Sequence, residues 1–83
     1  MPPMQLTAGA ERDLSAVPRS VLPRLLEALD RLREDPALGK RLHGELGGRR
    51  SLRVGGYRIL YRYSEGLTIV TRIRKRDVVY RRP

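Results

Sequence analysis

Two adjacent glycines, Gly55-Gly56, constrain the fold of this sequence more than any other feature. They separate two segments in which apolar and polar residues alternate. Tight hairpin turns of type I′ or II′ need a positive φ, which glycine adopts without strain. A two-residue turn here pairs Val54 with Tyr57, and the same register then brings Leu52 opposite Ile59. The sequence therefore predicts an antiparallel hairpin on either side of these glycines.

The same register sets arginine against arginine on the other face of the hairpin. Arg53 lies opposite Arg58 and Arg49 opposite Arg62, with Ser51 facing Leu60 between them, while Arg50 faces Tyr61 on the first face. Like charges directly opposite each other destabilise a sheet. Since stability alone does not favour this arrangement, we expect an anion to bind there.

The residues before the hairpin predict a strand and two helices. Met4–Leu6 reads as a short strand, Thr7 as the N-cap of a helix over residues 8–16, and a second helix begins at Ser20. Proline at position 36 ends that helix, and residues 36–48 are expected to form a loop. The second helix carries leucines at the spacing of one apolar face, namely Leu22, Leu25, Leu26, Leu29 and Leu32.

A third strand over residues 67–74 completes the predicted sheet. A three-residue turn, Ser64-Glu65-Gly66, pairs Tyr63 with Leu67 and so places Arg58 opposite Arg72. The rest of this register sets Tyr61 opposite Ile69, Ile59 opposite Thr71 and Tyr57 opposite Ile73. The tyrosines at 57, 61 and 63 would then lie in the core, and the outer face would gather Arg49, Arg53, Arg58, Arg62, Arg72 and Arg74.

These elements predict an α+β fold in the order βααβββ. Two N-terminal helices pack on one face of a small antiparallel sheet, and the 83 residues form a single domain over positions 1–83. No cysteine is present for a disulfide, and no apolar run approaches the length of a membrane span. The start of the sequence has no signal-peptide pattern, so we expect a cytoplasmic protein.

The net charge of +9 is concentrated in the second half of the sequence. Residues 1–39 carry five arginines and six acidic residues, whereas residues 40–83 carry thirteen basic and three acidic ones. Such a basic half indicates RNA, DNA or the ribosome as the partner. The alternative is a charged surface that serves solubility alone. The three acids, Glu45, Glu65 and Asp77, are scattered, so neither a metal site nor another cofactor is expected.

Several motifs in chain order resemble the RelE/ParE toxin superfamily of type II toxin–antitoxin systems. They are Leu42-His43-Gly44, the Arg-Val-Gly-x-Tyr-Arg-x-x-Tyr segment at 53–61, and Arg76 four residues before Tyr80. Members of the RelE-like branch are ribonucleases that cut messenger RNA in the ribosomal A site. ParE-like members inhibit DNA gyrase and typically lack the catalytic basic and tyrosine residues. The residues present here resemble the RelE-like branch.

The resemblance implies a set of site residues. Arg58, Arg76 and Tyr80 would be catalytic, and His43 would lie where the family carries a basic residue that contacts RNA. The charge pattern adds, as further residues that bind RNA or phosphate, Arg49, Arg53, Arg72 and Arg74 of the sheet and Lys40 and Arg41 of the loop. The best-known ribonucleases of this branch carry a pair of lysines at the positions that correspond to Arg49 and Ser51. This sequence therefore lacks that pair. The implied partners are a cognate antitoxin, the ribosome and its A-site messenger RNA. We expect a toxin that is monomeric alone and hetero-oligomeric with its antitoxin.

The implied reaction is attack of a ribose 2′-hydroxyl on the adjacent phosphate without a metal. Clustered arginines suit the dianionic transition state because each guanidinium donates two parallel hydrogen bonds to phosphate oxygens. Arginine does not lose its proton, so Arg49 cannot act as a base. Either Tyr80 is the base, or the substrate and the ribosome supply the alignment; His43 is the remaining candidate. A gyrase inhibitor without nuclease activity and a non-toxic RNA-binding remnant are the alternative functions.

Overall fold

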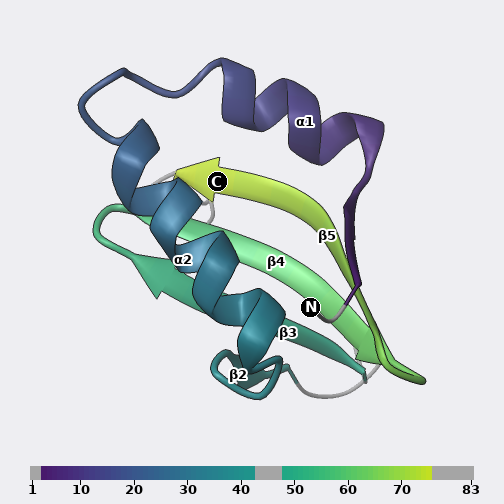
Figure 1. Cartoon of the computed structure of the whole chain (residues 1–83). Helices are drawn as coiled ribbons and strands as arrows, with labels where there is room; N and C mark the ends of the chain where they lie inside the picture. The colour runs from purple at the N-terminus through teal and green to yellow at the C-terminus, as the bar shows by residue number, and fades with distance from the viewer. Residues whose placement is uncertain (1–2, 43–47, 76–83) are drawn as a thin grey trace, which may run out of the picture.

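A five-stranded sheet with two helices forms the described part of the chain. The structure, a computed structural model, describes residues 3–42 and 48–75. The elements are β1 (Met4–Leu6), α1 (Ala8–Ser15), α2 (Leu22–Glu34), β2 (Lys40–Arg41), β3 (Arg49–Val54), β4 (Tyr57–Ser64) and β5 (Leu67–Lys75). In the sheet the strands follow the order β1-β5-β4-β3-β2. Helix α2 crosses one face of the sheet, and α1 runs beside β5 (Figure 1). The predicted α+β class is confirmed, and the predicted order βααβββ is correct except for one additional short strand, β2, between α2 and β3.

The first hairpin has the predicted register throughout. Val54 pairs with Tyr57, Leu52 with Ile59 and Arg53 with Arg58, and the pairing continues to Arg49 and Arg62. Gly55 has a φ of 61°. A positive φ at the first central residue is the pattern of a type II′ turn, whose twist matches that of the flanking strands. The glycine pair therefore fixes this half of the sheet as predicted.

The predicted register of the second hairpin is wrong. The turn has two residues, Glu65 and Gly66, both with positive φ (49° and 80°), so that Ser64 rather than Tyr63 pairs with Leu67. A register shift follows further along, between Leu60 and Tyr61. The observed pairs are Tyr57–Lys75, Arg58–Arg74, Ile59–Ile73, Leu60–Arg72, Tyr61–Val70, Arg62–Ile69 and Tyr63–Thr68. Glu65 has an unusual φ for a non-glycine residue, which composition alone does not predict.

The register shift is a β-bulge at Thr71 of β5. Leu60 pairs with Arg72 and Tyr61 with Val70, so Thr71 is the extra residue. The hydroxyl of Thr7 donates to the Thr71 carbonyl oxygen at 2.9 Å and accepts from the Ala10 backbone N–H at 3.1 Å. One side chain thus caps α1, as predicted, and also satisfies a backbone group at the bulge.

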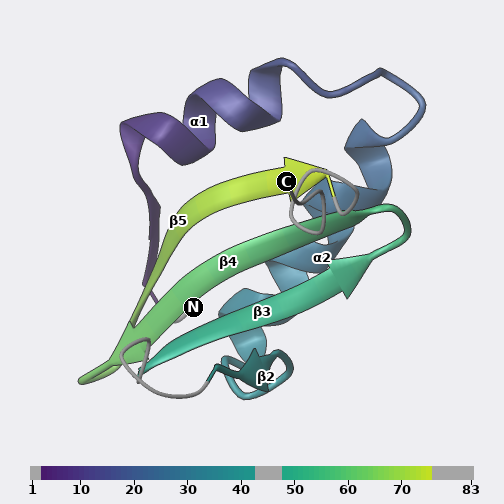
Figure 2. The same ribbon diagram turned by 180° about the vertical axis from the view of Figure 1, so that it is seen from behind.

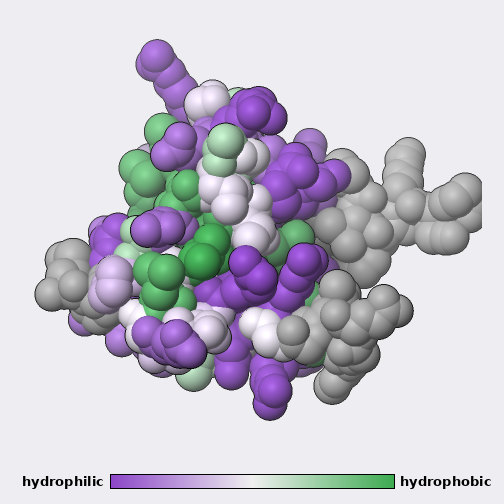
Figure 3. Space-filling model, turned by 90° about the vertical axis from the view of Figure 1, so that its right-hand side faces the viewer, coloured by the Kyte–Doolittle hydropathy of each residue, from purple (hydrophilic) through white to green (hydrophobic). Residues whose placement is uncertain are grey.

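Strand β1 makes the sheet mixed rather than antiparallel. It pairs parallel with β5, Gln5 opposite Ile69, whereas β2 to β5 pair antiparallel. After β1 the chain passes through α1 and α2 to β2 at the opposite edge of the sheet, and the parallel pairing of β1 with the last strand was not predicted. In the side view, an exposed strip of hydrophobic residues lies among hydrophilic ones (Figure 3).

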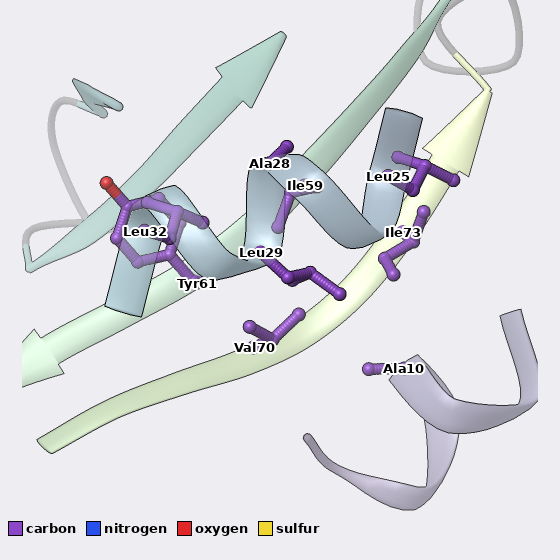
Figure 4. Close-up of a cluster of buried hydrophobic side chains, with 9 residues drawn as sticks. All are labelled: Ala10, Leu25, Ala28, Leu29, Leu32, Ile59, Tyr61, Val70 and Ile73. Atoms are coloured by element: carbon purple, nitrogen blue, oxygen red, sulfur yellow. The ribbon is translucent and has the colours of Figure 1, made fainter. Parts of the chain in front are cut away.

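The core lies between α2 and the sheet, with one residue added from α1 (Figure 4). Its fully or nearly buried apolar residues are Ala10, Leu25, Ala28, Leu29, Leu32, Ile59, Tyr61, Val70 and Ile73. The apolar face of α2 was predicted too wide, because Leu26 is 46% exposed and Leu22 only partly buried. The helix begins at Leu22 rather than Ser20, with Pro23 in its first turn, where the missing N–H breaks no hydrogen bond. Neither described helix is long and apolar enough to cross a membrane.

Tyr61 joins the segment after α2 to the sheet. Its hydroxyl donates to the Pro36 carbonyl oxygen at 2.6 Å and accepts from the Gly39 backbone N–H at 2.8 Å. A Cβ at Gly39 would lie 2.6 Å from the same hydroxyl oxygen, so only glycine fits without a shift. Part of the predicted loop is consequently strand β2, with Lys40 opposite Ser51 and Arg41 opposite Arg50.

The predicted tyrosine core is correct for Tyr61, which is fully buried, and wrong for Tyr63, which is 44% exposed. Tyr57 is partly buried against the core. Burial raises the pKa of the Tyr61 hydroxyl, with the Gly39 N–H opposing this shift. The phenol therefore stays neutral and acts as a donor and an acceptor at once.

We expect Tyr61→Phe to lower the free energy of unfolding by about 1–3 kcal/mol, because it leaves the Gly39 N–H and the Pro36 carbonyl without their buried partner. Chemical denaturation measures this value. Tyr63→Phe is the matched control on the same strand, and an exposed side chain should change stability by less than about 0.5 kcal/mol. Equal effects of the two substitutions would contradict this role of Tyr61.

Candidate anion-binding surface

The basic residues of β3, β4 and β5 share the face of the sheet opposite α2. Residues on neighbouring strands that pair directly point to the same side, and Arg53, Arg58 and Arg74 form such a row across three strands. Helix α2 lies behind the sheet when this face is turned to the viewer (Figure 2). We call it the arginine face; its members are Arg49, Arg53, Arg58, Arg62, Arg72 and Arg74.

The predicted face is confirmed, but one predicted pair is not. Arg58 lies opposite Arg74 rather than Arg72, and Arg72 lies opposite Leu60. The two-residue turn at Glu65 and Gly66 and the bulge at Thr71 together shift the register of β5 against β4 by two residues beyond the bulge. Because side chains alternate with a period of two, both arginines keep the predicted face while their partners change.

A hollow of about 450 Å³ opens where β2 joins the arginine face. Its polar lining consists of Lys40, Ser51, Arg53 and Arg58, and Leu38, Leu42 and Leu52 form its apolar part. We call it the basic hollow. Among these described residues three carry a positive charge and none a negative one. Arg58 is only partly exposed, so the field of its charge is less screened by water than that of a fully solvated arginine. The hollow therefore suits an anion.

Another hollow, of about 470 Å³, lies at the other end of β4 and is less suited to an anion. Arg62 and Tyr63 line it together with Glu65, which supplies a compensating carboxylate. Ser64, Gly48, Leu67 and Ile69 complete the lining. The described lining of this second hollow thus carries both signs of charge, whereas that of the basic hollow carries positive charge alone.

Arg72 is bound to an acidic residue of α1. Its Nε lies 2.7 Å from Asp13 Oδ2, and its NH2 group 3.1 Å from Oδ1. Asp13 Oδ2 also accepts from the Ile73 backbone N–H at 2.9 Å, on the edge of β5 beyond its pairing with β1. The hydrogen bond from Arg72 lowers the pKa of Asp13 below its ordinary value of 3.8; burial opposes this, and the Ile73 N–H and the charges of Arg72 and Arg74 add to it. Arg72 therefore stabilises the contact of α1 with the sheet.

Of the remaining predicted site residues, those that the structure describes lie away from the basic hollow. Arg49 is exposed opposite Arg62, away from the basic hollow. Arg41 pairs with Arg50 and so falls on the face opposite the arginine face. His43, Arg76 and Tyr80 lie outside the described residues. Within residues 3–42 and 48–75, no group of three or more histidine, cysteine or acidic side chains is placed to hold a metal ion.

The place of Lys40 beside Ser51 was not predicted from the sequence, because residues 36–48 were expected to form a loop. The sequence contains only a weak signal for strand β2. Gly39 precedes Lys40 where a Cβ would collide with the Tyr61 hydroxyl, and a basic pair directly after a glycine was available to form a short edge strand. Two-residue strands leave no periodicity to detect.

Comparison with known proteins gives matches over nearly the whole chain. Residues 4–80 match the sequence model of the ParE toxin of type II toxin–antitoxin systems, parDE. Toxin RelG of Mycobacterium tuberculosis is 37% identical to this chain over an alignment that covers 95% of each protein. The toxin–antitoxin complex RelBE2 of the same organism contains a chain with 34% identity and a TM-score of 0.81, covering 92% of this chain and 100% of that one. The isolated Escherichia coli RelE toxin has the same fold, with a TM-score of 0.79 at 18% identity, covering 90% of this chain and 84% of that one.

We expect Asp13→Asn to destabilise the fold at neutral pH and to lose this effect in acid. A lowered carboxyl pKa contributes stability above the unfolded value of about 3.9, and that contribution disappears as the pH falls through the folded pKa. Unfolding free energies of the native and Asn forms between pH 7 and pH 2.5 measure the difference. Asp30→Asn, in an exposed pair with Arg33, is the control and should leave little change at any pH. A difference for Asp13→Asn that stays constant over this range would contradict the ion pair.

We expect Arg53→Ala and Arg58→Ala each to weaken binding of a single-stranded RNA oligonucleotide and to reduce the dependence on salt. Each lost phosphate contact should lower the slope of log K against log salt by about 0.7. Fluorescence anisotropy at several salt concentrations gives the slope. Arg19→Ala removes the same charge from an exposed position between the helices and should keep the native slope. If all three variants shift equally, net charge rather than the basic hollow governs binding.

Proposed function

Because the chain belongs to the RelE/ParE superfamily of type II toxin–antitoxin toxins, we propose that it is a ribosome-dependent messenger-RNA endonuclease that inhibits translation. The proposed reaction is metal-free attack of a ribose 2′-hydroxyl on the adjacent phosphate. The observation that carries the proposal is the basic hollow. It gathers Lys40, Arg53 and Arg58 around a space of about 450 Å³, ample for a phosphate group with part of its nucleotide.

The charge of the hollow matches what the reaction creates. Attack by the 2′-hydroxyl turns a phosphate with one negative charge into a five-coordinate species with two. Donors that are already in place stabilise this added charge without having to reorganise. Arg58 and Arg53 lie directly opposite each other on adjacent strands, so their guanidinium groups can bind the same phosphate from two sides. A dianion that lies between them accepts hydrogen bonds from both guanidinium groups and offsets the repulsion of like charges on directly opposite residues.

The proposed roles differ among the arginines. Arg58 contacts the scissile phosphate, Arg53 supports it, and Arg49 and Arg74 guide the flanking backbone. Arg76 and Tyr80 are proposed as further catalytic residues and His43 as an RNA contact on the resemblance of their motifs alone. Arg41 is proposed as an RNA contact because of its charge. Arg72 is the least suited to RNA, because Asp13 already accepts two of its hydrogen bonds.

We also propose a cognate antitoxin as the protein partner. Two structures that are similar to this chain are toxin–antitoxin complexes, RelBE2 of Mycobacterium tuberculosis and RelB–RelE of Methanococcus jannaschii. A net charge of +9 favours an acidic partner, and one that covers the arginine face would exclude RNA from it. The toxin would be monomeric without its antitoxin and would act in the cytoplasm, where messenger RNA is translated.

We expect Arg58→Ala to reduce cleavage of host transcripts by a factor of about 10²–10³, the usual effect of removing one donor to a transition-state oxyanion. Primer extension on transcripts after induced expression detects new 5′ ends. Arg19→Ala should cleave as the native protein does. Full toxicity of Arg58→Ala, with the native pattern of 5′ ends, would show that the assignment of Arg58 is wrong.

Two other outcomes would overturn the proposed function itself. Induced DNA damage with intact transcripts would indicate inhibition of gyrase. Normal growth at high expression, with salt-sensitive RNA binding retained, would indicate a non-toxic RNA-binding protein.

A further inference from the structure

We propose that Lys40 is the general acid of the reaction and protonates the 5′-oxygen that leaves the scissile phosphate. The proposal rests on the proposed function and adds a proton donor to it. Of the four polar side chains that line the basic hollow, two are arginines and one is a serine. Arginine does not release its proton, and a serine hydroxyl is far too weak an acid. Among these described residues, Lys40 is therefore the one that can give up a proton and regain it.

The fold holds the backbone on both sides of Lys40. Before it, the Gly39 N–H binds the Tyr61 hydroxyl at 2.8 Å, and the Gly39 carbonyl accepts from Arg50 NH1 at 2.9 Å. After it, the Leu42 N–H donates to the Arg49 carbonyl oxygen at 2.9 Å. A two-residue edge strand would fray without such anchors. Held at both ends, the strand fixes the backbone from which the exposed Lys40 side chain extends.

The position of Lys40 suits a role opposite Arg58. Lys40 pairs with Ser51 of β3, and residues that pair directly share a face of the sheet. Strand β3 separates β2 from β4, so these two strands lie about 10 Å apart. Arg58 of β4 lines the same hollow as Lys40. Long side chains that extend from both strands can therefore reach opposite sides of one phosphate. Arg58 would bind its non-bridging oxygens, and Lys40 would reach the bridging oxygen on the side of departure.

The step balances without a co-reactant other than water. The 2′-oxygen forms a bond to phosphorus as its proton passes to a water molecule, and the bond from phosphorus to the 5′-oxygen breaks. The electron pair of that bond stays on the 5′-oxygen, which takes a proton from the Lys40 ammonium. The products are a 2′,3′-cyclic phosphate and a 5′-hydroxyl. The neutral amine of Lys40 then regains a proton from water.

The choice of residue types agrees with this role. The sequence has two lysines among its 18 basic residues, Lys40 and Lys75. If position 40 had to supply charge alone, arginine would serve it as well as it serves the rest of the arginine face. Lys75 pairs with Tyr57 and so lies on the face opposite the arginine face. The lysine in the hollow is thus placed where proton transfer is needed.

Lys40→Arg tests the proposal, because it keeps the positive charge and removes the transferable proton. The full-length protein is added in excess to ribosomes carrying a messenger RNA whose cleavage site the native protein has defined. We expect single-turnover cleavage to slow by a factor of about 10²–10⁴, as for the loss of a general acid. RNA affinity should stay within about twofold, because the ionic contact is kept. Lys75→Arg is the matched control and should cleave at the native rate.

A modified substrate distinguishes proton donation from a structural effect. Replacing the 5′-oxygen at the cleavage site by sulfur gives a leaving group that departs as a thiolate and needs no protonation. We expect Lys40→Arg to cleave this substrate within about threefold of the native rate. Equal slowing on the oxygen and sulfur substrates would overturn the proposal, as would near-native cleavage of the oxygen substrate by Lys40→Arg. Absence of cleavage by the native protein would instead refute the proposed function.

Discussion

The buried hydroxyl of Tyr61 is the interaction on which the arrangement of the site depends. It accepts from Gly39 and donates to Pro36, so one side chain from the middle of the sheet fixes the segment that follows α2. Arg50, which pairs with Tyr61 across β3 and β4, binds the Gly39 carbonyl from the same side. These contacts place β2 against β3 and bring Lys40 to the arginine face. A polar group in the core thus determines the position of a charged group at the surface.

The arginine face combines two opposite electrostatic situations. On the side of α1, Asp13 neutralises Arg72 and also accepts from the backbone of β5. The charge of Arg72 therefore stabilises the contact between α1 and the sheet. At the β2 side, the described lining of the basic hollow contains no acidic residue. A phosphate that binds beside Arg53 and Arg58 would therefore offset the repulsion between these two like charges. This division explains why arginines with the same orientation are unequal candidates for binding phosphate.

The sequence predicted those parts of the fold that rest on local rules. The glycine pair and strict alternation fixed the first hairpin to the residue, and Thr7 was recognised as a cap by its type and place. The second hairpin was mispredicted because its turn uses Glu65 at a positive φ and because Thr71 adds a bulge that is stabilised from α1. Strand β2 escaped prediction because tertiary contacts to Tyr61 create it. Leu26 was assigned to the core because the helical spacing alone does not show how far the sheet extends beneath α2.

The site was predictable in its charge and only partly in its geometry. The arginine face survived a wrong register, because a shift of two residues preserves the side on which each residue lies. The convergence of Lys40 with Arg58 depends on strand order, which periodicity does not contain. The most direct test of the central claim, phosphoryl transfer at the basic hollow, is the chemistry of the RNA ends formed on purified ribosomes. Attack by the 2′-hydroxyl predicts 5′-hydroxyl and 2′,3′-cyclic phosphate ends, and 5′-phosphate ends or intact messenger RNA would contradict it.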